Sequence, residues 1–296
     1  MFNFDPKNLD IKSLNDICEV YPYDNDISSN NWVVKVKRLD IKDVDTLNQT
    51  VQSIVLQYNT EHPSILSIKG YFIELSESNE WTIFIKMPRM SSSLLDIVNN
   101  YKEEKQDIPE ENIITWAYSI ICGLEYLHSK GIVHRDIKAS NILFDKLGRI
   151  KISDLCSSII VTEEDQLALV DEKRLLNQTR QYKAPELSNI QKGIQKKDLF
   201  KTDVWSLGVV LVELCLIFPK PMAKYMLSKD KEKALEEILA SVEKKYSRLL
   251  VEILKEMLFI DPQVRKSFTC LRVMFEERFA KILVILLFYL FFSFLV

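Results

Sequence analysis

One segment in the middle of the chain, residues 132–154, constrains the fold more than any other. It reads IVHRDIKASNILFDKLGRIKISD and holds a carboxylate at Asp136, an amine at Lys138 and an amide at Asn141. Two apolar runs on either side of a glycine-containing turn are typical of a β-hairpin. Such a hairpin places Asn141 and Asp154, which stand at its two ends, level with each other. We therefore expect these four side chains to form one site.

Composition and charge exclude several classes of protein. The chain has 296 residues, of which 47% are hydrophobic and 27% charged, and these shares are ordinary for a globular enzyme. A net charge of -3 gives no basic face, so we expect no nucleic-acid partner. The five cysteines are scattered and odd in number, which favours a reduced protein. The first residues lack a basic and apolar secretion signal, and the expected location is cytoplasmic.

Hydrophobic periodicity divides the chain into two parts. The first part predicts a strand over Trp32–Leu39, a helix over Leu47–Tyr58 and two short apolar runs, Ile65–Ile73 and Trp81–Met87. The second part predicts a long helix with its apolar stripe over Ile113–Leu127, then the hairpin, then a helical pattern from residue 204 onward. The first 90 residues or so are therefore mostly sheet with one helix, and the rest is mainly helical.

The end of the chain differs from everything before it. Residues 282–296 read ILVILLFYLFFSFLV and carry no charge. As a helix this run is about 22 Å long, shorter than a hydrocarbon core of about 30 Å. Phe279, Ala280 and a Lys281 that reaches the interface lengthen it toward the lower limit for spanning. We expect the tail, residues 281–296, to be a transmembrane anchor with the rest of the protein facing the cytosol. A buried terminal helix or a partner-binding helix are the alternatives.

The four polar groups suit phosphoryl transfer. That reaction needs a positioned hydroxyl, metal ions across the phosphates and cations on the developing charge. Asp136 can accept the proton of a hydroxyl, and Lys138 can face the transferred oxygens. Asn141 and Asp154 can bind a metal ion through their side-chain oxygens.

Several motifs in order make the chain resemble the eukaryotic protein kinases. HRDIKASN resembles the catalytic loop and SDLC stands where the family has its metal-binding Asp-Phe-Gly. Ala184-Pro185-Glu186, the run DVWSLG from Asp203 and Arg265, the expected partner of Glu186, follow at the family's spacing. Lys138 together with Thr179 resembles the serine/threonine branch. Residues 182–187, YKAPEL, give a weaker resemblance to single-chain kinases that activate cyclin-dependent kinases.

This resemblance implies an α+β, bilobal kinase domain over residues 1–280. Its small, mostly β N-lobe with one helix covers about residues 1–90, and its larger helical C-lobe covers about residues 91–280. ATP and Mg²⁺ are the implied cofactors, and a protein with serine or threonine is the implied substrate. In that reading Asp136 and Lys138 are catalytic, and Asn141 and Asp154 hold the metal. Residues expected to bind ATP are Lys35, Met87, Met90, Asn141 and Leu143, with Lys86 or Met87 as the gatekeeper beside the adenine.

Control by phosphorylation is also implied by the resemblance. Arg135 precedes the catalytic aspartate, as in kinases whose arginine pairs with a phosphate on the activation segment. Ser157, Ser158 and Thr162 are candidate sites. Glu163, Glu164 and Asp165 can supply fixed negative charge instead, or form an ordinary solvated acidic loop. A regulatory protein partner is a further expectation.

The chain departs from the family in three places. No glycine precedes Gly70, so the usual glycine-rich lid over the phosphates cannot form. The phosphate-binding lysine is Lys35 or, two residues on, Lys37. No carboxylate lies between Asp45 and Glu61, and the family's spacing places Ser53 where the lysine's glutamate partner belongs, with Gln49 and Gln52 close by. Residues 153–156 correspond to the family's metal-binding Asp-Phe-Gly and are called the metal loop. In this loop Cys156 replaces the glycine.

These observations leave two hypotheses of function. The first is an active serine/threonine kinase, because the groups nearest the chemistry are all present. The second is a pseudokinase that acts as a scaffold or allosteric partner, which explains the departures together. We expect His62, His128 and His134 to be structural, and Asp203, Trp205 and Gly208 to belong to the scaffold.

Overall fold

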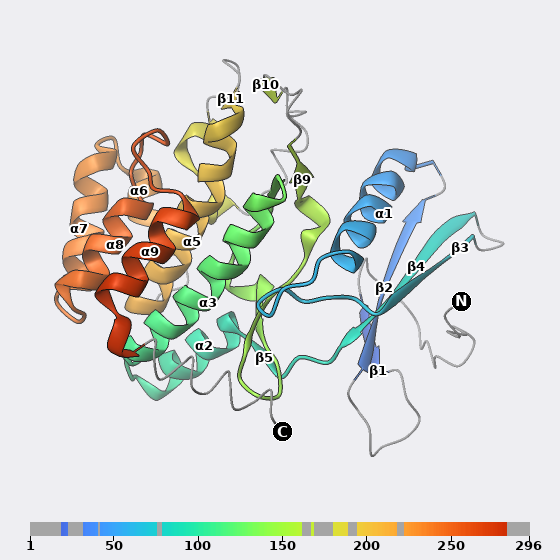
Figure 1. The fold of residues 1–296 in the computed structure, drawn as a ribbon, viewed down its shortest axis with the longest axis horizontal. Coiled ribbons are helices and arrows are strands. Elements are labelled where there is room, and N and C mark those ends of the chain that lie inside the picture. Colours follow the sequence, from blue (N-terminus) through green and yellow to red (C-terminus); the bar gives the residue numbers. More distant parts are fainter. Residues whose placement is uncertain are drawn as a thin grey trace.

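The chain folds into a small β-rich lobe and a larger helical lobe, shown as a computed structural model in Figure 1. The structure describes residues 19–22, 32–40, 42–75, 79–161, 167–168, 180–188, 194–217 and 222–282. The α+β, bilobal architecture confirms the predicted fold class.

The small lobe is a four-stranded antiparallel sheet with one helix packed on it. Its strands are β1 (Glu19–Pro22), β2 (Trp32–Asp40), β3 (Gly70–Leu75) and β4 (Glu80–Pro88), in the order β1-β2-β4-β3. Helix α1 (Val44–Tyr58) begins where the Asp43 side chain accepts a hydrogen bond from the Thr46 amide at 3.1 Å. Four isoleucines, Ile54, Ile68, Ile83 and Ile85, form the buried core between helix and sheet.

Short strands connect the two lobes and carry the predicted hairpin. Strand β7 (Ile142–Phe144) pairs with β8 (Ile150–Ile152) around the turn that contains Gly148, as the sequence predicts. β5 (Ser92–Ser93) extends this sheet on the β7 side. β6 (Ile132–Val133) pairs with β9 (Ile159–Ile160) on the other side of the site. The remaining short elements are η2 (Ala139–Asn141), η3 (Leu155–Ser157), η4 (Arg180–Tyr182), η5 (Pro185–Ser188), β10 (Leu167–Ala168) and β11 (Ile194–Gln195).

The helical lobe is built around α5 (Lys196–Leu216), whose residues 202–215 are buried on every side. Burial on every side makes this helix the centre of the lobe, although it also carries the buried polar residues Asp203 and Glu213. The other helices are α2 (Leu94–Glu104), α3 (Glu110–Ser129), α6 (Ala223–Leu227), α7 (Lys231–Glu243), α8 (Arg248–Met257) and α9 (Phe268–Arg278), of which α3, α7 and α8 contact α5 directly. Gly208 allows the close approach of α5 to the end of α8, because an added Cβ would lie 2.8 Å from Leu258 Cδ2.

The apolar run Ile65–Ile73 is only partly a strand: Ile65 makes a single bridge to Ile152, and β3 begins at Gly70. One expectation from the sequence needs correction. The expected transmembrane helix is wrong for the described part of the chain, where no helix is both long and apolar enough to cross a bilayer. Ile282 ends the described residues and packs against the main core, and residues 283–296 lie outside them.

Four of the five cysteines lie in the described part of the chain. Cys122, Cys156, Cys215 and Cys270 form no disulfide in the described part of the chain. Cys18 lies outside the described residues.

Candidate active site

The catalytic loop between β6 and η2 is anchored by one buried carboxylate. Asp203 of α5 accepts hydrogen bonds from the backbone amides of His134 (2.7 Å) and Arg135 (2.8 Å), and its Oδ2 lies 2.9 Å from His128 Nε2. Burial alone would raise the pKa of Asp203, but the hydrogen bond and charge of His128, with His134 and the backbone donors, lower it overall. The loop can therefore hold Arg135 at φ 70°, a conformation that few side chains adopt.

The structure brings together the three catalytic-loop groups that the sequence singled out. Lys138 Nζ lies 2.7 Å from Asp136 Oδ2. Asn141 Nδ2 donates to the same oxygen at 3.0 Å and to the backbone carbonyl of Asp136 at 2.9 Å. The carboxylate of Asp136 is thus held in one orientation by a cation and an amide.

The hairpin then brings Asp154 to this group. Both the amide and the hydroxyl of Ser153 donate to the Asn141 carbonyl at 2.9 Å, so Asp154 follows directly after the open end of the hairpin, opposite its turn. Asp154 has φ 66°, which is unusual for a residue other than glycine and is a second strained position in the site. Its Oδ2 lies 3.9 Å from Lys35 Nζ.

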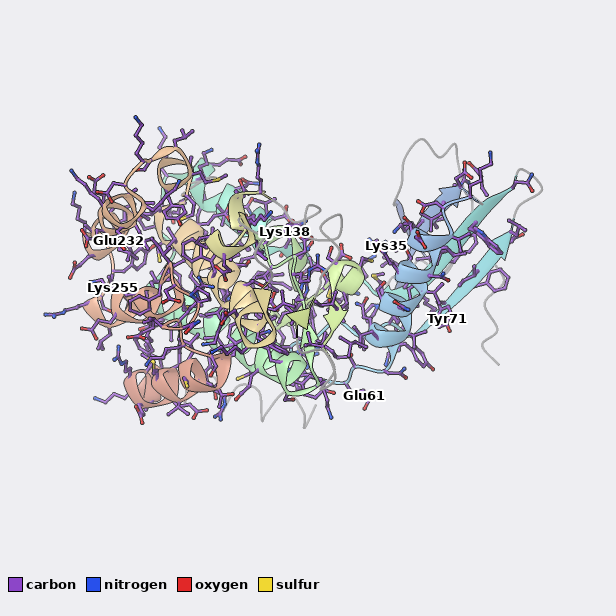
Figure 2. All side chains as sticks on the ribbon, turned by 90° about the horizontal axis from the view of Figure 1, so that it is seen from above. Lys35, Glu61, Tyr71, Lys138, Glu232 and Lys255 are labelled. Atoms are coloured by element: carbon purple, nitrogen blue, oxygen red, sulfur yellow. The ribbon has the colours of Figure 1, made fainter. Side chains whose placement is uncertain are left out.

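The charge of Lys35 affects how Asp154 ionises. Burial raises the pKa of this carboxyl, but Lys35 and a hydrogen bond from Cys156 outweigh burial and lower it overall. Asp154 is therefore an anion at neutral pH, as a ligand for a divalent cation must be. Figure 2 shows Lys35 and Lys138 on the two sides of the junction between the lobes.

The two candidate lysines of β2 have different partners. Lys35 reaches Asp154, whereas Lys37, on the same face of the strand, donates to the hydroxyl of Thr50 in α1 at 2.9 Å. Thr50 is buried. This geometry favours Lys35 as the lysine of the site, and it gives Lys37 a role in joining strand to helix that the sequence did not reveal.

Helix α1 contacts the metal loop without a carboxylate. Ser53 occupies the position expected for the family's glutamate, and its hydroxyl lies 3.6 Å from Cys156 Sγ while it donates to the Thr50 carbonyl at 2.7 Å. Burial and the nearby Asp154 charge raise the pKa of the Cys156 thiol to about 11, so the thiol stays protonated at neutral pH. A neutral serine–cysteine contact thus links α1 to the metal loop, where the family has an ion pair with the lysine of β2.

Met87, Met90 and Leu143, which are expected to lie around the adenine, have different neighbours in the structure. Met87 packs against the isoleucine cluster of the small lobe. Met90 lines a cavity of about 370 Å³ together with Trp32 and Asp145. Leu143 lies in β7 opposite Lys151. Their role in adenine binding stays a prediction.

The side-chain oxygens of Asn141 and Asp154 suit a divalent cation that prefers oxygen ligands, such as Mg²⁺. Among the described residues no hydrogen bond uses the side-chain oxygen of Asn141, because both of its contacts to Asp136 are made by the amide nitrogen. In the described part of the chain no group of three or more His, Cys, Asp or Glu is arranged so that it could hold a metal ion. Mg²⁺ commonly takes only one or two oxygens from protein side chains and completes its octahedral shell with substrate phosphates and waters.

The segment after the metal loop ends at a buried ion pair. Arg265 Nη1 lies 2.7 Å from Glu186 Oε1, and Nη2 lies 3.2 Å from Oε2, which confirms the predicted pairing. Of the candidate phosphorylation sites, Ser157 and Ser158 are described, and the Ser158 hydroxyl donates to the His134 carbonyl at 3.3 Å. Thr162, the acidic residues 163–165 and Thr179 lie outside the described residues.

The histidines hold structural positions. His134 Nε2 lies 3.0 Å from the Ser153 carbonyl, which ties the catalytic loop to the metal loop. His62 stacks on Tyr126 with ring centroids 5.1 Å apart, and its Nδ1 accepts from the Ser64 amide at 3.0 Å.

Comparison with known proteins agrees with this geometry. The family model described as "Protein kinase domain" matches residues 17–275. Nek4, a serine/threonine-protein kinase of Mus musculus, is 28% identical over 235 residues, which are 78% of this chain and 28% of Nek4. Mitogen-activated protein kinase kinase kinase 3 of Arabidopsis thaliana is 32% identical over 168 residues, 57% of this chain and 23% of that protein. Serine/threonine-protein kinase Nek11 of Homo sapiens is 29% identical over 223 residues, 74% of this chain and 32% of Nek11.

The chain spans about a third or less of the length of these relatives. Nek4 and Nek11 are named serine/threonine-protein kinases, in agreement with the predicted branch. The family uses ATP with a divalent metal. The match over most of the chain shows that it belongs to the protein kinase family.

Proposed function

We propose that this domain is an ATP-dependent kinase that transfers the γ-phosphoryl group to a serine or threonine hydroxyl of a protein. The observation that carries the proposal is the cluster of Asp136, Lys138 and Asn141, joined by contacts of 2.7 to 3.0 Å and followed by Asp154 across the hairpin. The family and the names of the relatives support the same activity.

Each group has a distinct part in the proposed reaction. Asp136 accepts the proton of the substrate hydroxyl as the hydroxyl attacks, and its contacts with Lys138 and Asn141 keep it aimed. Lys138 then turns its charge toward the transferred phosphoryl oxygens. Because the groups are already oriented, little reorganisation is needed during transfer.

Lys35, Asn141 and Asp154 form the nucleotide–metal half of the site. When bound, Mg²⁺ supplies positive charge across the phosphate oxygens. In our proposal Asn141 and Asp154 hold it through one oxygen each. Lys35, which pairs with Asp154 at 3.9 Å, contacts the nucleotide phosphates once Asp154 faces the cation.

Nucleotide and metal binding test this half of the site directly. We expect ATP to bind the full chain more tightly with Mg²⁺ than without it, as measured by calorimetry. Asp154→Asn should remove the effect of Mg²⁺, whereas Asp107→Asn, a carboxylate in an exposed ion pair with Lys245, should leave it unchanged. Phosphoamino-acid analysis of a labelled protein mixture should then give phosphoserine or phosphothreonine. Absence of both nucleotide binding and transfer would contradict the proposal and favour the pseudokinase hypothesis.

A further inference from the structure

A second polar site lies where the residues before Glu186 meet helix α6. A cavity of about 600 Å³ opens between η4 and α6, and we call it the basic pocket. Its charged side is formed by Arg180, Lys183 and Lys231, and its apolar side includes Trp205, Tyr225 and Met226. Among the described residues no aspartate or glutamate lines it, although acidic residues outnumber basic ones in the whole chain, 42 to 39.

The cations of the basic pocket have no carboxylate partners among the described residues. None of the ion pairs in the described part of the chain involves Arg180, Lys183 or Lys231. The described carboxylate nearest in sequence to Arg180 and Lys183 is that of Glu186, which is paired with Arg265. Asp230, beside Lys231, accepts from the Lys233 amide as the cap of α7.

Positive charge is crowded at Lys183, and Lys231 is fixed in place by its contacts. Partial burial, and then the charge of Arg180, lower the pKa of Lys183. Lys231 donates to the carbonyls of Tyr225 (2.7 Å) and Met226 (2.8 Å), and it lies 4.9 Å from the Tyr225 ring. An anion in the pocket would relieve the repulsion at Lys183, and Lys231 is already fixed in place to meet it.

The apolar side of the pocket includes exposed surface. Met226 is 42% exposed, and its neighbour Leu227 is 87% exposed at the end of α6. Methionine adapts to apolar side chains of different shape and is common at peptide-binding surfaces. The pocket thus offers cations and an adaptable apolar patch side by side.

The basic pocket adjoins the catalytic loop. The backbone of Ala139, next to Lys138, is near enough to affect the pKa of Tyr182, which lies between two of the pocket residues. Its hydroxyl also lies 2.6 Å from Glu213 Oε2, and its carbonyl accepts from the Ser206 hydroxyl at 2.8 Å. These contacts fix Tyr182, so its neighbours Gln181 and Lys183 in the pocket lie close to the catalytic loop.

We infer that the basic pocket binds an acidic segment of the protein substrate, with carboxylates on Arg180 and Lys183 and an adjacent apolar side chain on Met226. The inference rests on the proposed kinase activity for the identity of the partner, and it assigns the substrate class that the activity leaves open. Charge complementarity selects the acidic residues, and the apolar contact adds affinity that salt does not screen.

Binding of matched peptides to the full chain tests this inference without requiring catalysis. One labelled peptide carries serine among aspartates, glutamates and leucine, and the other has asparagine and glutamine in place of the acids. Fluorescence anisotropy should show at least tenfold tighter binding of the acidic peptide at low salt, with the ratio falling in 0.5 M salt because exposed charges are screened.

Variants locate the binding to the pocket. Arg180→Gln with Lys183→Gln should reduce the preference to less than about twofold, and Lys183→Glu should favour a basic peptide. The matched control is Lys255→Gln on α8, which Figure 2 shows at the far end of the helical lobe from Lys138. Unfolding curves of all variants check that each is folded.

A kinetic arm separates this inference from the proposed function. Equal kcat/KM for acidic and neutral peptides would overturn the inference while leaving the kinase activity standing. A salt-sensitive preference in binding that the pocket variants abolish, with no phosphate transfer to either peptide, would support the pocket and contradict the activity. Binding that is unchanged in the double variant would overturn the inference directly.

Discussion

Replacing Arg265 should destabilise the helical lobe strongly, because its side chain is fully buried and ionised. The Arg265 side chain is 0% exposed and that of Glu186 12%, and the guanidinium also donates to the carbonyls of Phe259 and Lys201. Removing one partner of such a pair leaves a charge without compensation, which costs about 3–5 kcal/mol. Arg265→Met keeps most of the side-chain volume and removes every donor, so we expect a loss of free energy of unfolding in that range.

Urea unfolding monitored by tryptophan fluorescence measures this loss. With an m-value of about 3 kcal/mol/M, the midpoint should fall by about 1–1.7 M. Trp205 lies 5.2 Å from the guanidinium and reports on the same region. The control is Arg248→Met, because Arg248 is 83% exposed in its pair with Glu252 and should contribute about 1 kcal/mol or less.

A double variant distinguishes the charge effect from lost packing. Adding Glu186→Gln to Arg265→Met removes the charge that was left unpaired, so the double loss should be smaller than the sum of the two single losses by about 1 kcal/mol or more. A loss for Arg265→Met no larger than that for Arg248→Met, or strict additivity in the double variant, would refute the reasoning.

Three further predictions follow from particular contacts. Gly208→Ala should cost about 1–3 kcal/mol by overpacking, since the new Cβ meets Leu258 at 2.8 Å. Adding Leu258→Ala should give a total loss smaller than the sum of the two single losses, and thermal unfolding of the three variants checks this. Burial lowers the pKa of His62, so its contribution to stability is complete above pH of about 6.5 and declines as the pH falls toward the folded-state pKa. The difference between the urea midpoints at pH 5 and pH 7 should therefore be smaller in His62→Gln than in the wild-type chain, and an equal difference would contradict this. Ser53→Glu should compete with Asp154 for Lys35 and lower the Mg²⁺ concentration needed for ATP binding, whereas Ser53→Gln, equal in size but neutral, should not; identical Mg²⁺ titrations for the two variants would count against the role given to Lys35.

The sequence predicted the site best where the chemistry depends on neighbours in the chain. Asp136, Lys138 and Asn141 lie within one loop, and the hairpin pattern was enough to place Asp154 beside them. The Glu186–Arg265 pair, far apart in sequence, was available only through the family resemblance.

The sequence predicted less where partners come from different elements. Periodicity placed Lys35 and Lys37 on the same face of β2 but could not say which one faces Asp154, because that depends on how α1 sits on the sheet. The contact of Ser53 with Cys156 was likewise unforeseen, since it joins positions on opposite sides of the cleft between the lobes. The terminal apolar run met the length rule for a membrane span only marginally, and no span is found in the described residues.

The central claim is that the catalytic loop still performs transfer in a chain with no glycine before Gly70 and no glutamate at Ser53. A single-turnover measurement with saturating ATP, Mg²⁺ and an acidic serine peptide tests it most directly, by comparing the wild-type chain with Asp136→Asn. Loss of the catalytic base should slow transfer by about 10²–10⁴-fold while nucleotide affinity changes little. Equal rates in the two chains, or no transfer by the wild type with ATP bound, would contradict the claim.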